Sequence, residues 1–106
     1  MTEQYQLVLS TCPTNDIAKK IAHALIEQRL AACVNILPNI TSVYWWENEV
    51  VCENEVQLLI KTTTDKYSDV SAEIARLHPY TTPEIIALNI QHGDKNYLNW
   101  ITESLK

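Results

Sequence analysis

Glycine is almost absent from this sequence: Gly93 is the only glycine among 106 residues, whereas average usage of about 7% predicts roughly seven. Phosphate-binding loops of the G-x-G-x-x-G and P-loop types need several glycines so that the backbone can approach the phosphate, and both are therefore excluded. The shortage also disfavours an all-β fold closed by many glycine turns. A chain with so few glycines has little backbone freedom to lose on folding, which predicts a rigid, stable fold.

Clustered positive charge and long apolar runs are also missing. The formal net charge is −5, and the eight Lys and Arg residues are scattered, with Lys19 and Lys20 as the only adjacent pair. Nonspecific binding of nucleic acid needs clustered basic residues, so we expect no nucleic-acid partner. No segment approaches the roughly 20 apolar residues of a membrane span. Residues 1–12 lack a basic stretch followed by a long apolar run, so we expect no signal peptide and no membrane partner.

The three cysteines, Cys12, Cys33 and Cys52, form neither a disulfide framework nor a C-x-x-C unit. An odd number of well-separated cysteines is simplest to explain in a reducing compartment, and we expect a cytoplasmic protein. The apolar content is sufficient for a core, so we expect no metal or cofactor to be required for folding.

One domain covering residues 1–106 is expected, because no linker, repeat or low-complexity segment interrupts the chain. Apolar and β-branched runs predict strands at 5–12, 33–46 (interrupted at Pro38), 50–64 and 84–91, the last one buried. Apolar residues at helical spacing predict helices from residues 14–16 to about 32, from Asp65 or Ser68 to His78, and from Asp94 onward. The order βαββαβ with an extra C-terminal helix predicts an α+β, ferredoxin-like sandwich.

The two strands on either side of residues 47–49 are longer than a domain of this size can cover. They predict a long β-hairpin with an exposed apolar tip, and such surfaces usually contact a partner. We therefore expect an oligomer whose interface includes Tyr44, Trp45, Val50 and Val51.

Cysteine and histidine are suitable ligands for copper and zinc, which makes Cys33, Cys12 and His78 the candidate metal ligands. For Cys33 the alternative is a small buried hydrophobic residue, and for His78 it is a helix C-terminal cap. A Cys12 thiolate could gain from the N-terminal end of the following helix, or the side chain could simply pack at the strand end.

A ligand cleft at a subunit boundary could be lined by Lys61, Tyr80, Glu84 and Trp46, which offer cationic, aromatic and anionic contacts. The alternative is an interface salt bridge under a hydrophobic cover. The acidic residues of the hairpin are expected to form a solvated rim, and the alternative is a weak site for a hard cation; they are Glu47, Glu49, Glu53 and Glu55.

Five segments together resemble the CutA family of divalent-cation tolerance proteins. They are RLAACVNILP at 29–38, YWWE at 44–47, EVQLLIKT at 55–62, HPYTTPE at 78–84 and YLNWI at 97–101. The resemblance extends from Leu7 to Leu105. It implies a cytosolic homotrimer of ferredoxin-like subunits, assembled like the PII signalling proteins, with long hairpins that pair with adjacent subunits. It also implies a role in tolerance of copper and other divalent metals, and Cys33 matches the cysteine of the family's Leu-Ala-Ala-Cys motif.

Two functions follow as hypotheses. The first is a trimeric metal-tolerance protein that binds copper or related divalent ions. The second is a PII-like signalling or adaptor trimer that holds a small ligand or partner segment in clefts between subunits. No nucleophile, base and orienting residue form a recognisable set, so we do not expect an enzyme.

Overall fold

The computed structural model describes residues 4–106. Its elements are β1 (Tyr5–Cys12), α1 (Asn15–Glu27), β2 (Cys33–Trp46), β3 (Glu49–Thr63), a 3₁₀ turn η1 (Thr64–Lys66), α2 (Tyr67–Leu77), β4 (Ile86–Ile90) and α3 (Lys95–Ser104).

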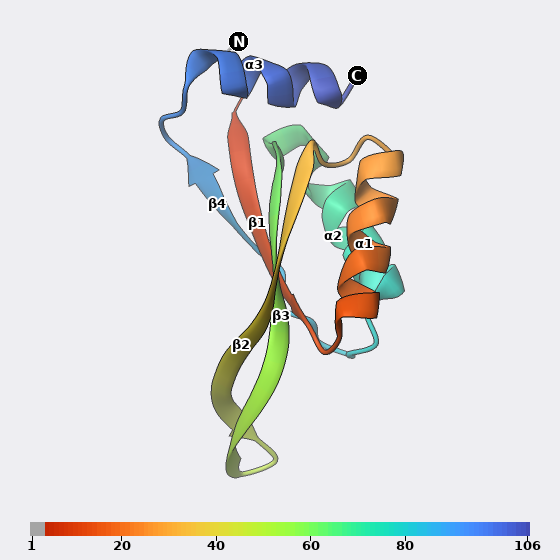
Figure 1. The fold of residues 1–106 in the computed structure, drawn as a ribbon, viewed down its shortest axis with the longest axis vertical. Coiled ribbons are helices and arrows are strands. Elements are labelled where there is room, and N and C mark those ends of the chain that lie inside the picture. Colours follow the sequence, from red (N-terminus) through yellow and green to blue (C-terminus); the bar gives the residue numbers. More distant parts are fainter. Residues whose placement is uncertain (1–3) are drawn as a thin grey trace.

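The four strands form one antiparallel sheet in the order β2-β3-β1-β4. Helices α1 and α2 cover one face of this sheet, and α3 crosses the end of the sheet opposite the hairpin (Figure 1). This arrangement is the expected α+β, ferredoxin-like sandwich with an added C-terminal helix.

The core lies between the sheet and helices α1 and α2. Successive strand side chains point to opposite faces, and every second residue of the covered part of β3 faces the helices: Val56, Leu58 and Ile60 are at most 5% exposed. The helices contribute the apolar stripes predicted from their spacing, and the buried members include Ile21, Leu25, Val70 and Ile74.

Two helix boundaries differ from the sequence expectation. Helix α1 ends at Glu27 rather than near residue 32, because Arg29 takes a left-handed backbone conformation with φ of 61°. Helix α2 begins at Tyr67 as a continuation of η1, and neither Asp65 nor Ser68 caps it. Asp94 does cap α3, because its side chain accepts a hydrogen bond from the Tyr97 amide at 3.0 Å.

Strand β4 was expected to be buried and is instead an exposed edge strand. Ile86 and Leu88 are 51% and 50% exposed. They lie in register with Leu9 and Leu7 of β1, on the sheet face opposite α1 and α2. An apolar run therefore identified the strand correctly, but none of the described helices and strands covers that face.

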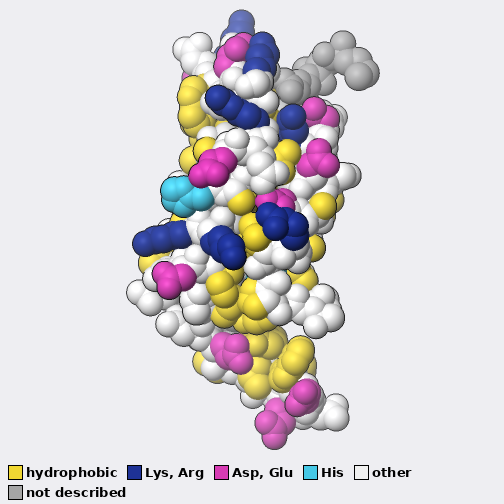
Figure 2. Space-filling view, turned by 90° about the vertical axis from the view of Figure 1, so that its right-hand side faces the viewer, with side chains coloured by type: hydrophobic (Ala, Val, Ile, Leu, Met, Phe, Trp, Pro, Cys, Tyr) yellow, Lys and Arg dark blue, Asp and Glu magenta, His cyan; other side chains and the backbone are white. Residues whose placement is uncertain are grey.

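The hairpin of β2 and β3 extends past the end of β1. The last β1 residue, Cys12, lies opposite Val56, so residues 49–55 of β3 pair only with β2. Seven residues of strand extend about 23 Å, and the molecule is correspondingly elongated, with extents of 47 × 26 × 22 Å. Viewed from the helix-covered side, Lys and Arg side chains are mixed with Asp and Glu over the body, whereas the coloured side chains toward the hairpin tip are hydrophobic or acidic (Figure 2).

The scarcity of glycine does not mean that the backbone avoids glycine-like conformations. Within residues 4–106, four residues that are not glycine take positive φ angles between 49° and 65°: Arg29, Asn39, Glu47 and Asn48. At Gly93 a Cβ atom would lie 2.8 Å from Cδ2 of Leu98, so a larger residue there would force the Leu98 side chain to shift. The shortage of glycine therefore leaves local backbone strain at these four residues.

Candidate functional site: an acidic cavity at the hairpin base

A cavity of about 420 Å³ lies where the hairpin leaves the body of the protein. Strand β1, both hairpin strands and the loop that precedes β4 contribute to its lining, which consists of Thr11, Ser42, Val43, Tyr44, Glu55, Thr82 and Glu84. The polar groups of these side chains are carboxylates and hydroxyls, and no lysine or arginine is among them.

The proline of β2 helps to shape this cavity. The β2–β3 register shifts between Leu37 and Ile40, so that one extra residue is accommodated around Pro38 and Asn39. A single extra residue exchanges the faces to which all later side chains of a strand point. As a result Ser42 and Tyr44 share the face of Glu53 and Glu55 beyond the bulge.

Glu55 is the most unusual residue of the cavity, because it is a carboxylate with only 6% of its surface exposed. The one hydrogen bond that it makes with residues 4–106 comes from the hydroxyl of Tyr80 at 3.5 Å, the long limit for such a bond. Neither ion pair found in residues 4–106 involves it. A buried carboxylate is usually compensated by a cation or by several hydrogen bonds, and Glu55 has little of either. The expectation that Glu55 belongs to a solvated rim was therefore wrong.

Three titratable side chains near Glu55 have raised pKa values. The pKa of Tyr44 is raised to about 12, chiefly by its hydrogen bond to Glu53 and also by the charges of Glu53 and Glu55. Burial, assisted by Glu55, raises the pKa of the Cys12 thiol to about 11. The pKa of Tyr80 is also raised, first by burial and then by Glu55 and Glu53. The region therefore disfavours additional negative charge.

His78 fixes the loop beside the cavity. It is 6% exposed, and its Nδ1 accepts a hydrogen bond from the Tyr80 amide at 3.1 Å. The other ring nitrogen, Nε2, then carries the proton and donates to the Thr11 carbonyl at 2.7 Å. The ring also contacts that of Tyr80, with centroids 4.7 Å apart. Both nitrogens are therefore engaged, and His78 ties the loop after α2 to the end of β1.

The three candidate metal ligands do not meet within one chain. Cys12 and His78 lie at the hairpin end of the body, whereas Cys33 pairs with Lys61, which in turn pairs with Leu7. Leu7 precedes Cys12 by five residues, about 17 Å along the strand. In the part of the chain that the structure describes, no group of three or more His, Cys, Asp or Glu residues could hold a metal ion.

The four residues expected to line a ligand cleft lie in three separate places. Glu84 lines the acidic cavity and Tyr80 borders it through Glu55. Lys61 lies near α3, with its Nζ 5.7 Å from the centre of the Tyr97 ring. Trp46 is at the hairpin tip, opposite Glu49 and 62% exposed. One copy of the chain therefore does not form this cleft.

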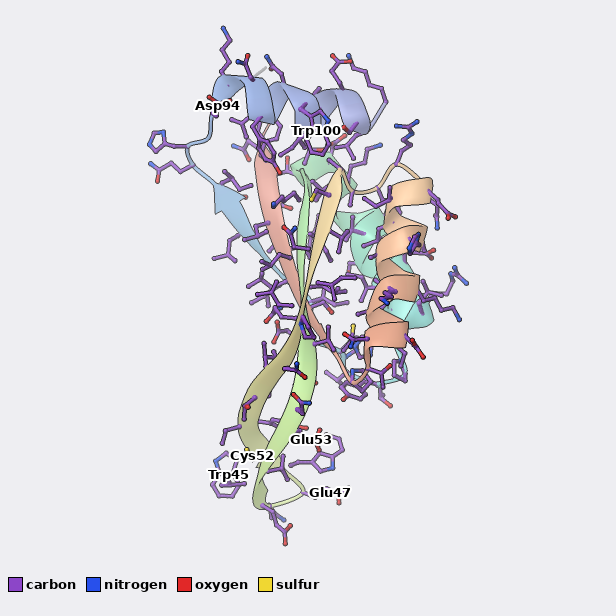
Figure 3. The ribbon with its side chains drawn as sticks, in the orientation of Figure 1. Trp45, Glu47, Cys52, Glu53, Asp94 and Trp100 are labelled. Atoms are coloured by element: carbon purple, nitrogen blue, oxygen red, sulfur yellow. The ribbon has the colours of Figure 1, made fainter. Side chains whose placement is uncertain are left out.

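The expected interface residues differ in their exposure. Trp45 and Val50 pair across the hairpin and are 72% and 61% exposed, whereas Tyr44 and Val51 are half-buried. Trp45 and Cys52 lie on one side of the hairpin and Glu53 on the other (Figure 3). Sequence reasoning missed Val43, which is 66% exposed and pairs with Cys52 beside Trp45.

A second uncovered apolar surface lies on the sheet face opposite α1 and α2. Leu37, Ile86 and Leu88 are each 42–51% exposed there. At the edge of the body, α3 adds Tyr97 and Trp100, whose rings are 5.6 Å apart. Among the helices described, none is long and apolar enough to cross a membrane.

The sheet order, the helices on one face and the projecting hairpin place this protein in the class of ferredoxin-like α+β proteins. Its sequence and fold narrow that class to one family. The chain belongs to the CutA1 divalent ion tolerance protein family, whose model matches residues 6–104.

Relatives match over nearly their whole length. The divalent-cation tolerance protein CutA of Thermus thermophilus is 50% identical over 99 residues, covering 93% of this chain and 96% of the relative. That of Pectobacterium atrosepticum is 40% identical over 100 residues, covering 94% and 91%. The resemblance predicted from the five sequence segments is confirmed.

Solved structures agree with the fold. The Thermus thermophilus protein superposes with a TM-score of 0.91 at 49% identity, covering 94% of this chain and 97% of that one. CutA1 of Oryza sativa gives 0.94 at 40% identity, covering 97% and 94%. The Archaeoglobus fulgidus structure, named a periplasmic divalent cation tolerance protein, gives 0.93 at 39% identity, covering 96% and 99%.

Proposed function

We propose that this chain works as a homotrimer that binds divalent metal ions, copper among them, and contributes to metal tolerance. The observation that carries the proposal is the amount of apolar surface that a single chain leaves uncovered. It comprises the hairpin tip, with Val43, Trp45, Trp46 and Val50, and the open sheet face, with Leu37, Ile86 and Leu88. Exposed patches of this kind typically contact a partner. The names of the relatives supply the link to divalent cations.

A second copy is the natural cover for both surfaces. Strand β2 is an edge of the sheet, and an unpaired edge can accept a strand from another chain. If the hairpin of one copy contacts the open face or edge of the next, the contact is heterologous and closes into a ring only at a fixed number of copies. The family resemblance favours three.

Among the proposed metal ligands, Cys33 is the most available. Its thiol is partly exposed, and its partner in the register, Lys61, shares the face opposite the helices. Cys12 is completely buried, and its pKa of about 11 disfavours the thiolate that binds metals. His78 would have to give up a hydrogen bond to offer a ring nitrogen. We therefore propose that Cys33 contributes to a site shared between subunits, with Cys12 and His78 in supporting positions.

Light scattering and a copper titration test this proposal. The mass should be three times that of the 12.1 kDa chain, and Cu(II) should bind in a stoichiometry related to the trimer. Cys33→Ser should weaken copper binding at least tenfold, whereas Cys52→Ser, the control on an exposed cysteine, should not. A monomeric mass would contradict the assembly, and equal copper binding by the two variants would contradict the ligand assignment.

The PII-like alternative is favoured by a separate observation. Lys61, Trp46 and the Tyr80–Glu84 loop are separated within one chain, and only contacts between subunits could bring them together in a ligand cleft. In a screen of small ligands by thermal shift, Lys61→Ala should abolish any stabilisation seen in the wild type. A ligand whose effect survives this substitution does not use the proposed cleft.

Two further parts of the proposal concern role and location. We propose a non-enzymatic protein, in keeping with relatives named for tolerance rather than for a reaction. We propose the cytoplasm as its location, since all three cysteines are unpaired. Fractionation of cells that express the tagged full chain tests the location, and recovery in the periplasm would contradict it.

A further inference from the structure

We propose that the cavity at the hairpin base is a binding site for an organic cation, an ammonium or guanidinium group that hydrogen-bonds to Glu55 and Glu84. This inference goes beyond metal tolerance and uses neither cysteines nor histidines. Its first support is the buried Glu55 carboxylate, which is 6% exposed and has one long hydrogen bond. A group with several N–H donors would supply the missing compensation.

The lining of the cavity selects for a donor-rich cation. Two acidic residues line it, the buried Glu55 and the exposed Glu84, and the hydroxyl-bearing residues of the lining are Thr11, Ser42, Tyr44 and Thr82. Carboxylates accept hydrogen bonds only, and hydroxyls can accept them. No basic side chain among the described residues lines the cavity. An ammonium or guanidinium group complements this set, and an anion does not.

The potential of the site has the right sign. Tyr44 lines the cavity, and its pKa is raised, chiefly by its hydrogen bond to Glu53 and also by burial and by the charges of Glu53 and Glu55. The negative charge that disfavours a phenolate here favours a cation in the same space.

Size distinguishes an organic cation from a bare metal ion. A cavity of about 420 Å³ is within the range of small-molecule pockets. A hard metal ion needs six or more oxygen ligands at roughly 2.0–2.6 Å, and residues 4–106 contain no group of three or more His, Cys, Asp or Glu residues that could hold a metal ion. The space and the dispersed acceptors fit the head of a primary amine or of an arginine-like group.

This cation has two possible sources with the same chemistry. It could be a free small amine, or it could be a Lys or Arg side chain of a second copy of this chain, since the cavity adjoins the projecting hairpin. The two sources predict different consequences when the charge of Glu55 is removed. Loss of a free ligand leaves assembly unchanged, whereas loss of a side-chain contact weakens it.

The test titrates the full chain with ethylammonium and methylguanidinium chlorides, compared with KCl at the same ionic strength, and follows the backbone amides of Thr11 and Tyr80 by NMR. Saturable binding in the millimolar range is expected for the wild type. Glu55→Gln should weaken it at least tenfold, and Glu84→Gln, at the exposed mouth, about two- to fivefold. The matched control is Glu49→Gln, the same charge change on the exposed part of the same strand, which should leave binding unaltered.

Light scattering of the same variants identifies the source. If the cation is a free amine, Glu55→Gln and Glu49→Gln have equal masses at every concentration. If it comes from a second copy, its side chain already occupies the cavity and the added amines do not bind to the wild type. In that case Glu55→Gln dissociates at protein concentrations where Glu49→Gln remains assembled. Because Glu55→Gln alters a buried residue, Glu84→Gln provides a second test at an exposed residue of the same cavity. Circular dichroism checks that both variants are folded.

The proposal is overturned if no amine binds and Glu55→Gln assembles like the control. It is also overturned if MgCl₂ displaces the amines at equal concentration, because the cavity would then be a site for hard metal ions. Neither result depends on copper binding, so this inference and the proposed metal function can fail separately.

Discussion

The two halves of β3 lie in opposite environments although they form one continuous strand. From Val56 to Thr63 the strand lies between β1 and β2 beneath two helices, and Leu58, Ile60 and Thr62 are completely buried. From Glu49 to Asn54 it pairs only with β2 and is mostly exposed. Residues 56–63 are stabilised by contacts within their own chain, whereas in residues 49–54 the apolar side chain of Val50 remains 61% exposed.

Glu55 lies at the boundary between these halves, next to Val56 and opposite Ile40. The cavity is therefore placed where contact within the chain ends and contact with a partner can begin. A charge buried at such a boundary can report on whether a partner or ligand is present, because either would change its surroundings.

The largest expected effect is a loss of stability caused by a substitution in the buried half of β3. Leu58→Ala should lower the free energy of unfolding by about 3 kcal/mol, because it removes apolar contacts and leaves a cavity in a packed core. Val50→Ala, on the exposed half of the same strand, should change the unfolding of the dissociated subunit by less than about 0.5 kcal/mol. Urea unfolding at protein concentrations that give a single-chain mass measures both. Equal losses would show that the hairpin is stabilised within one chain.

The next effect concerns assembly. Trp45→Ala should cost about 2 kcal/mol of association free energy, as expected for a large aromatic residue at the centre of an interface, or about a 30-fold weaker dissociation constant. Sedimentation over a dilution series measures it. Ile26→Ala is the control, since Ile26 is 40% exposed on α1, on the helix-covered side. An unchanged dissociation constant for Trp45→Ala would remove the hairpin tip from the interface.

A third effect compares charges in the two regions. In the body, Glu73 receives two hydrogen bonds from Arg76, at 2.7 and 2.9 Å, and a third from Gln28. These contacts, Arg76 first, lower the pKa of Glu73 from 4.5 to about 2. A lowered pKa in the folded state stabilises the fold above the unfolded value, and this contribution is lost as the pH falls toward 2.

Glu73→Gln should therefore be less stable than the wild type at pH 7, with a deficit that shrinks between pH 4.5 and about pH 2. Urea midpoints across this range test the prediction. Glu49→Gln is the hairpin control, because its carboxylate is exposed. If the two variants lose the same amount of stability with the same pH dependence, the loss reflects net charge rather than the Arg76–Glu73 pair.

Local pattern was enough to predict most of the fold. Patterns among neighbouring residues predicted the apolar faces of α1 and α2, the start of α3 after Asp94 and the order of helices and strands along the chain. The structure confirms all of these. The exposure of β4 could not be predicted in the same way. Ile86 and Leu88 look like buried strand residues, and only the topology shows that no helix covers their face.

The acidic cavity was harder to predict than the fold. Glu55 resembles the other hairpin acids in sequence, and its burial depends on Thr11, Tyr80 and Glu84, which are distant from it in the sequence. One local signal was available: Glu55 is followed by the buried Val56 at the start of the apolar half of β3. The bulge at Pro38 and Asn39 was anticipated as an irregularity, but its effect on the direction of Tyr44 depends on a register that the sequence does not give.

The smallest expected effect is a gain in stability from introducing a glycine into the turn at the tip of the hairpin. Glu47 and Asn48 form the turn with φ angles of 49° and 65°, a pair of positive values that favours asparagine followed by glycine. The double substitution Glu47→Asn, Asn48→Gly should raise the free energy of unfolding by about 0.5 kcal/mol, since the relief of left-handed strain exceeds the entropic cost of the new glycine only slightly. Urea unfolding measures the gain, and Glu47→Asn alone should provide part of it. A loss of stability would mean that the Glu47 side chain contributes contacts worth more than the strain, and that the tip, like the buried half of β3, is stabilised by its side chains.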